Sequence, residues 1–192
     1  MIMNENKENI IKVSLSLFLH NSYAGVSMND ILSKAGLSRG AFYHYFESKE
    51  ACFKECVKYY LAQVTHPEPA DYTSISLKEF LEDNIRRMYN TLNEIGPLDR
   101  LLFLKEAFKI ITDFAKYIEH RNMEELAVWT KVVKNAVKSG EIKSNIPVRE
   151  IAGLFITQCD GILLTHSIAM DSSKGYAKVE KQWNNLYSMI KS

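Results

Sequence analysis

The chain is poor in the residues that break helices or cross-link small domains. Its 192 residues include four prolines, eight glycines and three cysteines. So few prolines and glycines argue against a loop-rich or all-β fold. The cysteines, Cys52, Cys56 and Cys159, are odd in number and cannot form a complete set of disulfides. Because Cys52 and Cys56 are spaced as neighbours on a helix face, we expect buried thiols in a reducing compartment.

Long apolar runs and targeting signals are also missing. No stretch of about 18 apolar residues occurs, so we expect no transmembrane helix and no membrane partner. The first residues, Met1–Glu8, lack the basic start and the apolar run of a signal peptide. These absences predict a cytoplasmic protein.

Neither sign of charge is in excess. Lys and Arg number 24 and Asp and Glu number 23, which leaves a formal net charge of +1. Net charge alone therefore indicates no nucleic-acid, membrane or acidic partner. Apolar residues make up 46% of the chain, which is ordinary for a globular protein with a buried core.

Catalytic and metal-binding motifs are absent as well. The sequence has no Gly-rich phosphate loop, no cluster at metal-ligand spacing and no supported nucleophile–base pair. Cys159 and His166 share a helix face seven residues apart, while Asp160 points elsewhere. A buried thiol and an interface histidine are favoured over a metal site or a nucleophile pair there. We therefore predict no enzyme, no cofactor and no metal.

What the chain does have is helical periodicity from end to end, which predicts an all-α protein. The expected helices cover residues 6–20, 27–36, 38–46, 48–64, 76–92, 98–118, 120–138, 148–169 and 176–190. Residues 98–118 are apolar almost all round, which predicts a buried central helix, broken near Thr112 and Asp113. Residues 66–71 contain two prolines and are the expected linker, and residues 171–175 are the expected loop before the last helix.

The segment from Ser27 to Lys49 has the length and the turn of a helix-turn-helix. Ser27 is the expected N-cap of the first short helix, with Asp30 completing a capping box. Gly36 ends that helix, and Ser38 caps the next. Phe42 and Phe46, four residues apart, form the buried face of the second helix.

Burial of these two rings turns a polar face outward. That face holds Arg39 and Tyr43, and beside them Gly40 and His44. Such a helix can enter the major groove and read base edges with its N-terminal residues. Ser27 and Lys49 stand at the starts of the flanking helices, where free N–H groups, a hydroxyl and an ammonium suit phosphate contacts.

Residues 10–57 resemble the DNA-binding domain of the TetR family of bacterial transcriptional regulators. The matching residues are Phe18 and the segments 27–31, 35–46 and 48–50. The resemblance implies that bases are contacted by Ser38, Arg39, Gly40, Ala41 and His44, and phosphates by Ser27, Tyr43 and Lys49. Ser14, Ser22 and Leu32 depart from the family pattern, and none of them touches the recognition face.

The resemblance also implies two domains and a homodimer. Residues 1–50 would form a three-helix head, joined by a connecting helix at 48–65 to a larger helical bundle at 66–192 that binds a ligand and dimerises. Residues 1–65 hold seven Lys or Arg against six Asp or Glu, so one head binds DNA weakly, whereas two linked heads gain through effective concentration. A two-fold dimer predicts a palindromic operator. The candidate interface lies on residues 148–169 and 176–190, at Ile162, His166, Trp183 and Tyr187, with ordinary intramolecular core as the alternative.

The larger bundle has enough apolar and aromatic surface to line a pocket. Solid core is the alternative. The candidate lining residues are Met88, Tyr89, Phe103, Phe108, Trp129, Phe155 and Cys159. The leading hypothesis is a ligand-responsive repressor of double-stranded DNA operators, released by a small apolar or aromatic effector. The alternative is a DNA-binding interaction protein whose C-terminal body holds a protein partner without a small effector.

Overall fold

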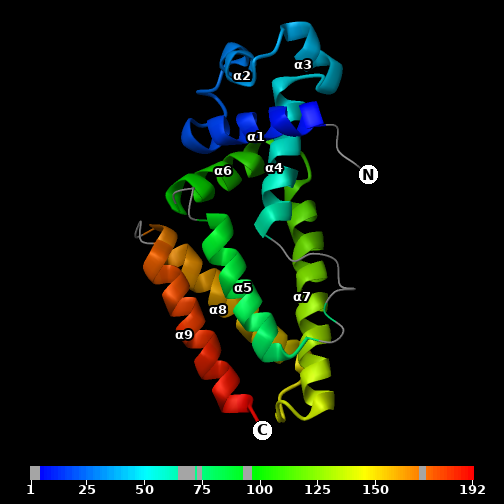
Figure 1. Cartoon of the computed structure of the whole chain (residues 1–192), viewed down its shortest axis with the longest axis vertical. Coiled ribbons are helices and arrows are strands. Elements are labelled where there is room, and N and C mark those ends of the chain that lie inside the picture. The colour runs from blue at the N-terminus through cyan, green and yellow to red at the C-terminus, as the bar shows by residue number, and fades with distance from the viewer. Residues whose placement is uncertain (1–4, 65–71, 73–74, 93–96, 169–171) are drawn as a thin grey trace. The chain divides into compact units, whose positions relative to one another are not determined.

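The computed structural model describes residues 5–64, 72, 75–92, 97–168 and 172–192 (Figure 1). The helices are α1 (Glu5–His20), α2 (Met28–Ala35), α3 (Arg39–Tyr45), α4 (Lys49–Val64), α5 (Leu77–Leu92), α6 (Pro97–Ile110), α7 (Phe114–Ser139), α8 (Val148–Ile168) and α9 (Ser172–Ile190). Apart from one antiparallel bridge between Ile142 and Lys191, these described ranges contain no β structure. The predicted all-α fold is confirmed. The predicted linker at 66–71 lies outside the described residues.

The chain divides into two compact units. The first consists of residues 1–63 and 99–115, and the second of residues 64–98 and 116–192. The first unit therefore contains α1 to α4 and nearly all of α6, and the second contains α5, most of α7, α8 and α9. Sequence reasoning assigned residues 99–115 to the C-terminal bundle, whereas these residues are part of the first unit.

Aromatic rings hold α1, α4 and α6 together in the first unit. Phe53 of α4 packs edge-on against Phe18 of α1 at 5.0 Å and against Phe103 of α6 at 5.4 Å between ring centroids. All three side chains are buried. The edge-to-face geometry is the favoured arrangement of aromatic pairs and adds to the free energy of burying their surface.

Local capping sets the bounds of α2 and α3. The Ser27 hydroxyl accepts the Asp30 N–H at 3.2 Å, and the Ser27 N–H donates to the Asp30 carboxylate at 2.7 Å. These bonds lower the pKa of Asp30. Gly36 ends α2 with a φ of 66°, in the left-handed region that glycine adopts most readily. The Ser38 hydroxyl accepts the Ala41 N–H at 3.2 Å, so the predicted caps of the helix-turn-helix are confirmed.

Large rings also fill the core of the second unit. Trp129 of α7 stacks on Phe155 of α8 at 5.7 Å and meets Trp183 of α9 edge-on at 5.2 Å. The Trp183 indole N–H donates to the Phe155 carbonyl at 2.9 Å. This bond satisfies the polar end of a side chain that is only 1% exposed.

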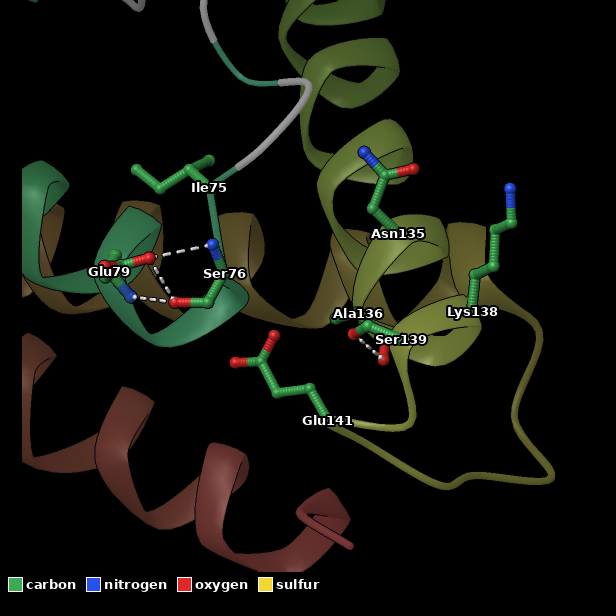
Figure 2. Close-up of a pocket in the computed structure, with 8 residues that line it drawn as sticks. All are labelled: Ile75, Ser76, Glu79, Asn135, Ala136, Lys138, Ser139 and Glu141. Atoms are coloured by element: carbon green, nitrogen blue, oxygen red, sulfur yellow. Dashed lines mark hydrogen bonds between the residues drawn. The ribbon is translucent and has the colours of Figure 1, made fainter.

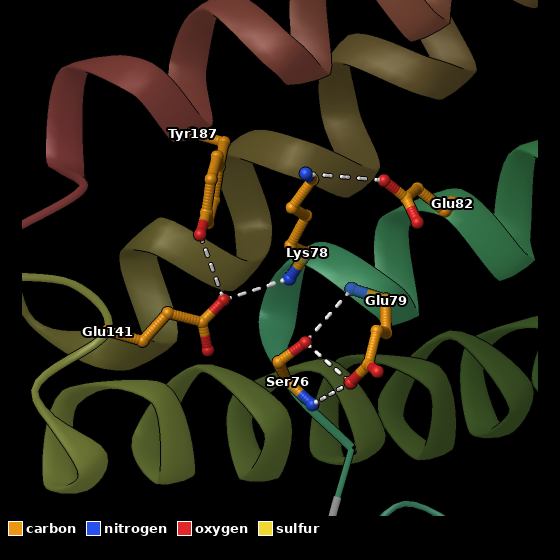
Figure 3. A network of polar contacts seen from close by, with 6 residues as sticks. All are labelled: Ser76, Lys78, Glu79, Glu82, Glu141 and Tyr187. Carbon is orange, nitrogen blue, oxygen red and sulfur yellow. Dashed lines mark hydrogen bonds and ion pairs between the residues drawn. The ribbon is translucent and has the colours of Figure 1, made fainter.

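The first turn of α5 is closed by a carboxylate from a distant turn (Figure 3). Ser76 and Glu79 form a capping box at the start of this helix. The Glu141 carboxylate accepts the N–H groups of Leu77 and Lys78 at 2.9 and 3.0 Å, and the Tyr187 hydroxyl at 3.1 Å. A negative charge at this position suits the positive end of the helix dipole. Glu141 therefore joins α5, the turn after α7 and the end of α9.

A pocket of about 480 Å³ lies beside this network, between the start of α5 and the end of α7 (Figure 2). Its lining is largely polar and includes Ser76, Glu79, Asn135, Lys138 and Glu141. The residues predicted to line an apolar ligand pocket do not border it.

The predicted break near Thr112 and Asp113 is confirmed, but the predicted burial of residues 98–118 is wrong. α6 ends at Ile110 and α7 begins at Phe114, with Asp113 between them at a φ of 61°. Leu102 and Phe108 of α6 are 47% and 54% exposed, because α6 packs through the side that carries Phe103 and Ala107. A helix start near residue 120 is also wrong, since α7 runs unbroken through that region.

The predicted loop at 171–175 is wrong for its last residues, because α9 already begins at Ser172. Gly175 is helical, and a Cβ atom added there would lie only 3.0 Å from the His166 Cβ. This glycine permits close packing of α9 against α8. Glycine also lowers the helix propensity of α9 at this position. Glycine at this position reflects helix packing and not a turn.

We predict that Glu141→Ala lowers the free energy of unfolding by about 2 kcal/mol, because two helix N–H groups and a tyrosine hydroxyl lose a charged acceptor. Glu141→Gln should cost less, since its amide oxygen can still accept. Urea unfolding followed by far-UV circular dichroism measures both. Glu82→Ala is the control, because Glu82 pairs with exposed Lys78 and its loss should cost about 0.5 kcal/mol or less. Equal effects of Glu141→Ala and Glu82→Ala would contradict the role of Glu141.

Candidate nucleic-acid interface

The short helix α3 is anchored by two rings and presents its other face to solvent. Phe42 and Phe46 are buried, with ring centroids 5.3 Å apart. Arg39, Tyr43 and His44 are exposed, as predicted from the four-residue spacing of the buried rings. Tyr43 is 47% exposed even though its ring meets Phe42 edge-on, so this large ring is available to a partner.

Gly40 and Ala41 leave the start of α3 open. A Cβ atom added at Gly40 would meet nothing within 4 Å, so packing does not require glycine there. Ala41 is partly buried. The first turn of α3 can therefore approach another surface closely, with the Arg39 guanidinium beside it.

Ser27 and Ser38 are exposed residues that immediately precede α2 and α3 as their N-caps. Each oxygen accepts a backbone N–H as a helix cap. The cap uses the hydroxyl oxygen as an acceptor, so the hydroxyl hydrogen can still be donated. A phosphate oxygen can accept it. Capping and phosphate binding are therefore compatible at both residues.

Lys49 points into the first unit. Its ammonium donates to the carbonyls of Tyr23 and Val26 at 2.9 and 2.8 Å. The same nitrogen lies 4.2 Å from the centroid of the Tyr23 ring, a cation–π contact. These contacts hold the segment between α1 and α2 at the first turn of α4. Sequence reasoning found the cation but not its partners, which lie 23 and 26 residues away.

Comparison with known proteins also identifies this region as a DNA-binding domain. Residues 10–56, which span α2, α3 and most of α1, match the family model of the bacterial regulatory proteins of the tetR family. These residues form the DNA-binding domain of the TetR family of transcriptional regulators. Members of this family are regulators and not enzymes, and they bind DNA through their helix-turn-helix.

Relatives resemble this chain more strongly over a short stretch than over most of its length. The chain is 46% identical to the transcriptional regulator YerO of Bacillus subtilis over 59 residues, which cover 31% of this chain and 20% of that protein. It is 22% identical to the transcriptional repressor AcnR of Corynebacterium glutamicum, over 82% of this chain and 80% of that one.

The fold extends the likeness over the whole chain. The crystal structure of a TetR-family regulator from Cytophaga hutchinsonii matches with a TM-score of 0.69 at 20% identity, covering 100% of this chain and 98% of that one. At this identity the match establishes a shared fold.

The predicted ligand-lining residues are divided between the two units. Phe103 and Phe108 belong to the first unit, where Phe103 is buried and Phe108 packs on Phe114. The others belong to the second unit: Trp129, Phe155 and Cys159 in its core, and Met88 and Tyr89 partly buried against that core. The seven residues therefore do not all belong to one unit.

Two of the predicted dimer residues are buried inside the chain. Trp183 belongs to the core, and Tyr187 is engaged with Glu141. Neither presents a free surface to a partner, because α9 turns its rings toward α8 and the core. Ile162 is partly buried against the same core, and His166 packs on Gly175.

Sequence reasoning missed the exposed face of α8. Leu154, Leu164 and Ile168 are 41%, 51% and 66% exposed. Thr157, Gly161 and Thr165 are exposed on the same stripe, at helical spacing. The pattern was present in the sequence, but α8 carries large apolar residues on both its buried and its exposed face, so hydrophobicity alone did not separate the two.

The three cysteines are buried, free thiols, as predicted. Within the described ranges, no group of three or more His, Cys, Asp or Glu side chains could hold a metal ion. None of the helices in the same ranges is long and apolar enough to cross a membrane. Burial raises the pKa of the Cys159 thiol, which keeps it protonated at neutral pH.

Glu125 of α7 carries a charge that folding disfavours. Burial and the Asp160 carboxylate raise its pKa above the ordinary 4.5. A raised pKa means that the folded state binds this proton more tightly than the unfolded state. The native state is therefore penalised progressively as the pH rises from about 4.5 through the folded-state pKa.

We predict that Glu125→Gln raises Tm at pH 7.5 by roughly 2–4 °C, the shift that about 1 kcal/mol produces in a protein of this size. The advantage should shrink as the pH falls toward 4.5, where the wild-type carboxyl becomes protonated. Thermal unfolding across this pH range measures it. Glu124→Gln is the matched control, because Glu124 is exposed and lies 3.2 Å from His120, another exposed side chain. A lower Tm for Glu125→Gln at pH 7.5 would contradict the prediction.

Proposed function

We propose that this regulator is a repressor that binds a palindromic operator as a homodimer and is released by a small apolar or aromatic effector. The observation that carries the proposal is the exposed face of α3, with Arg39, Tyr43 and His44 held outward by the burial of Phe42 and Phe46. A relative that carries the name of a repressor supports the sign of regulation.

The N-terminal part of α3 enters the major groove in this proposal. Bases are contacted by Ser38, Arg39, Gly40, Ala41 and His44, and phosphates by Ser27 and Tyr43. Arg39 can donate two hydrogen bonds to one guanine edge, and His44 can donate or accept. The open first turn of α3, with glycine at position 40, allows the close approach that such contacts need.

A second copy of the chain covers the exposed face of α8. This stripe places large apolar side chains beside small ones, and an exposed apolar face of this kind favours an interface. Small residues at Thr157, Gly161 and Thr165 let a second helix approach closely. Because α9 packs along α8, a two-fold pairing of α8 brings four helices together. Dimerisation also compensates for heads whose net charge is close to zero.

The effector binds the second unit, which makes up most of the predicted C-terminal domain at residues 66–192, and the helix at 48–65 connects this domain to the head. Met88 and Tyr89, which are partly buried at the edge of an aromatic core, are the lining residues that the structure favours. An effector that prefers the arrangement unable to bind the operator shifts the population toward it. The coupling is reciprocal, so operator DNA weakens effector binding by the same factor.

The DNA-binding part is tested by mobility shift and footprinting on the DNA that flanks the gene, at stated salt. We expect a protected palindrome with two half-sites. Arg39→Ala and Tyr43→Ala should each weaken binding by about tenfold or more, the effect of losing one good base or phosphate contact. Lys58→Ala is the control, because this exposed cation lies on α4 and pairs with Glu55. A footprint that both variants leave unchanged would contradict the assigned face of α3.

The dimer is tested by light scattering of the purified protein. Wild type should have twice the mass of the 22.1 kDa chain. Leu164→Glu should be monomeric at micromolar concentration, because it places a charge in the centre of an apolar interface. Met189→Glu is the matched control, since Met189 is 82% exposed on α9 and lies off the stripe. A Leu164→Glu protein that remains dimeric would rule out this face of α8.

A further inference from the structure

The segment between α1 and α2, residues 21–27, is held from both sides by side chains of other helices. The Tyr23 N–H donates to the Glu106 carboxylate of α6 at 2.7 Å. The Tyr23 carbonyl accepts the Lys49 ammonium of α4 at 2.9 Å. Both polar backbone groups of one loop residue are therefore bound by charged side chains, which form the stronger class of hydrogen bond.

The Tyr23 ring is fixed as well. It stacks on Phe18 at 5.7 Å, meets Phe53 edge-on at 4.9 Å and lies under the Lys49 ammonium. Main chain and side chain of Tyr23 together have contacts with α1, α4 and α6. A loop residue held this completely has little freedom to move by itself.

The hold extends to the start of α2. Lys49 also binds the Val26 carbonyl, and the next residue is Ser27, the N-cap of α2. Ser27 is one of the proposed phosphate contacts, and α2 leads through Gly36 into α3. The position of α2 therefore depends on the loop that Glu106 and Lys49 hold.

We propose that Glu106 and Lys49 are positioning residues for DNA recognition, which hold the loop at Tyr23 from α6 and α4 and do not contact DNA themselves. The inference rests on the proposed operator binding by α2 and α3. It departs from the phosphate-binding role expected for Lys49, because two carbonyls and a ring already engage that ammonium in the free protein. It also gives α6 a direct role in positioning the DNA-binding face of α2 and α3.

For Glu106, the loss of charge and the loss of positioning should change DNA affinity in opposite directions. DNA is a polyanion, so the removal of a carboxylate from the DNA-binding unit should by charge alone tighten binding. Loss of the bond to Tyr23 should instead loosen the loop and weaken binding. The direction of the change therefore separates the two effects.

The experiment compares Glu106→Leu, Glu106→Gln and wild type on the duplex that wild type selects from a random-sequence library. Binding is measured at a temperature at which unfolding curves show every variant folded. Glu106→Leu should raise Kd by about tenfold, and Glu106→Gln, which can still accept the Tyr23 N–H, should stay within about threefold of wild type. Glu47→Gln, an exposed acid of the same unit, controls for charge. A Glu106→Leu protein that binds as tightly as wild type, or tighter, would overturn the proposal.

Lys49→Met adds a second readout, the dependence of affinity on salt. A lost phosphate contact lowers the slope of log K against log salt by about 0.9, whereas a lost positioning contact weakens binding at an unchanged slope. We expect the unchanged slope. A slope reduced by about 0.9 for each head would assign Lys49 to phosphate and overturn its positioning role.

Hydrogen exchange of the free protein separates this inference from operator binding itself. The Tyr23 amide should exchange slowly in wild type and Glu106→Gln, and at least about tenfold faster in Glu106→Leu. If wild type selects no DNA sequence, the proposed operator binding fails, and exchange still decides whether Glu106 holds the loop. Equal exchange in all three proteins would show that it does not.

Discussion

The ring of Phe53 is the contact on which the first unit depends. It lies on the connecting helix α4 and touches Phe18 of α1, Tyr23 of the following loop and Phe103 of α6. One buried side chain thus orders three helices and a loop. Because dense packing leaves such a ring little room, displacement of any one helix must be shared by the others. The ring contact with Phe53 places Tyr23 where its main chain can bind Glu106 and Lys49.

Near neutrality constrains how this regulator can bind DNA. Residues 1–65 hold seven Lys or Arg against six Asp or Glu, so counterion release by a single head is small. Lys49 is engaged internally, which removes one more cation from the exposed set. Accurate placement of a few contacts, doubled by a two-fold dimer, then has to supply the affinity that charge does not. Rigid support of the α1–α2 loop is consistent with this demand.

Features that depend on neighbouring residues were predictable from the sequence, and features that depend on contacts between distant helices were not. The caps at Ser27 and Ser38 and the turn at Gly36 involve partners within four residues, and all were found from sequence. Gly175 was misread because the reason for glycine is a neighbouring helix, which leaves no local trace. The exposed side chains Leu102 and Phe108 were misread for a related reason: an evenly apolar helix does not reveal which side is covered.

The sequence by itself determined the helices, the helix-turn-helix and the outward face of α3, because periodicity, caps and the spacing of Phe42 and Phe46 are local properties of the chain. Tertiary structure alone decided which partners distant side chains meet. The Glu106 carboxylate lies 83 residues from Tyr23, and Glu141 lies 64 residues from the helix start that it caps. Trp183, a candidate for the dimer interface with intramolecular core as the alternative, is buried in the core because α8 and α9 pack against each other. Contacts between residues so far apart follow from the packing of whole helices, which no local pattern encodes.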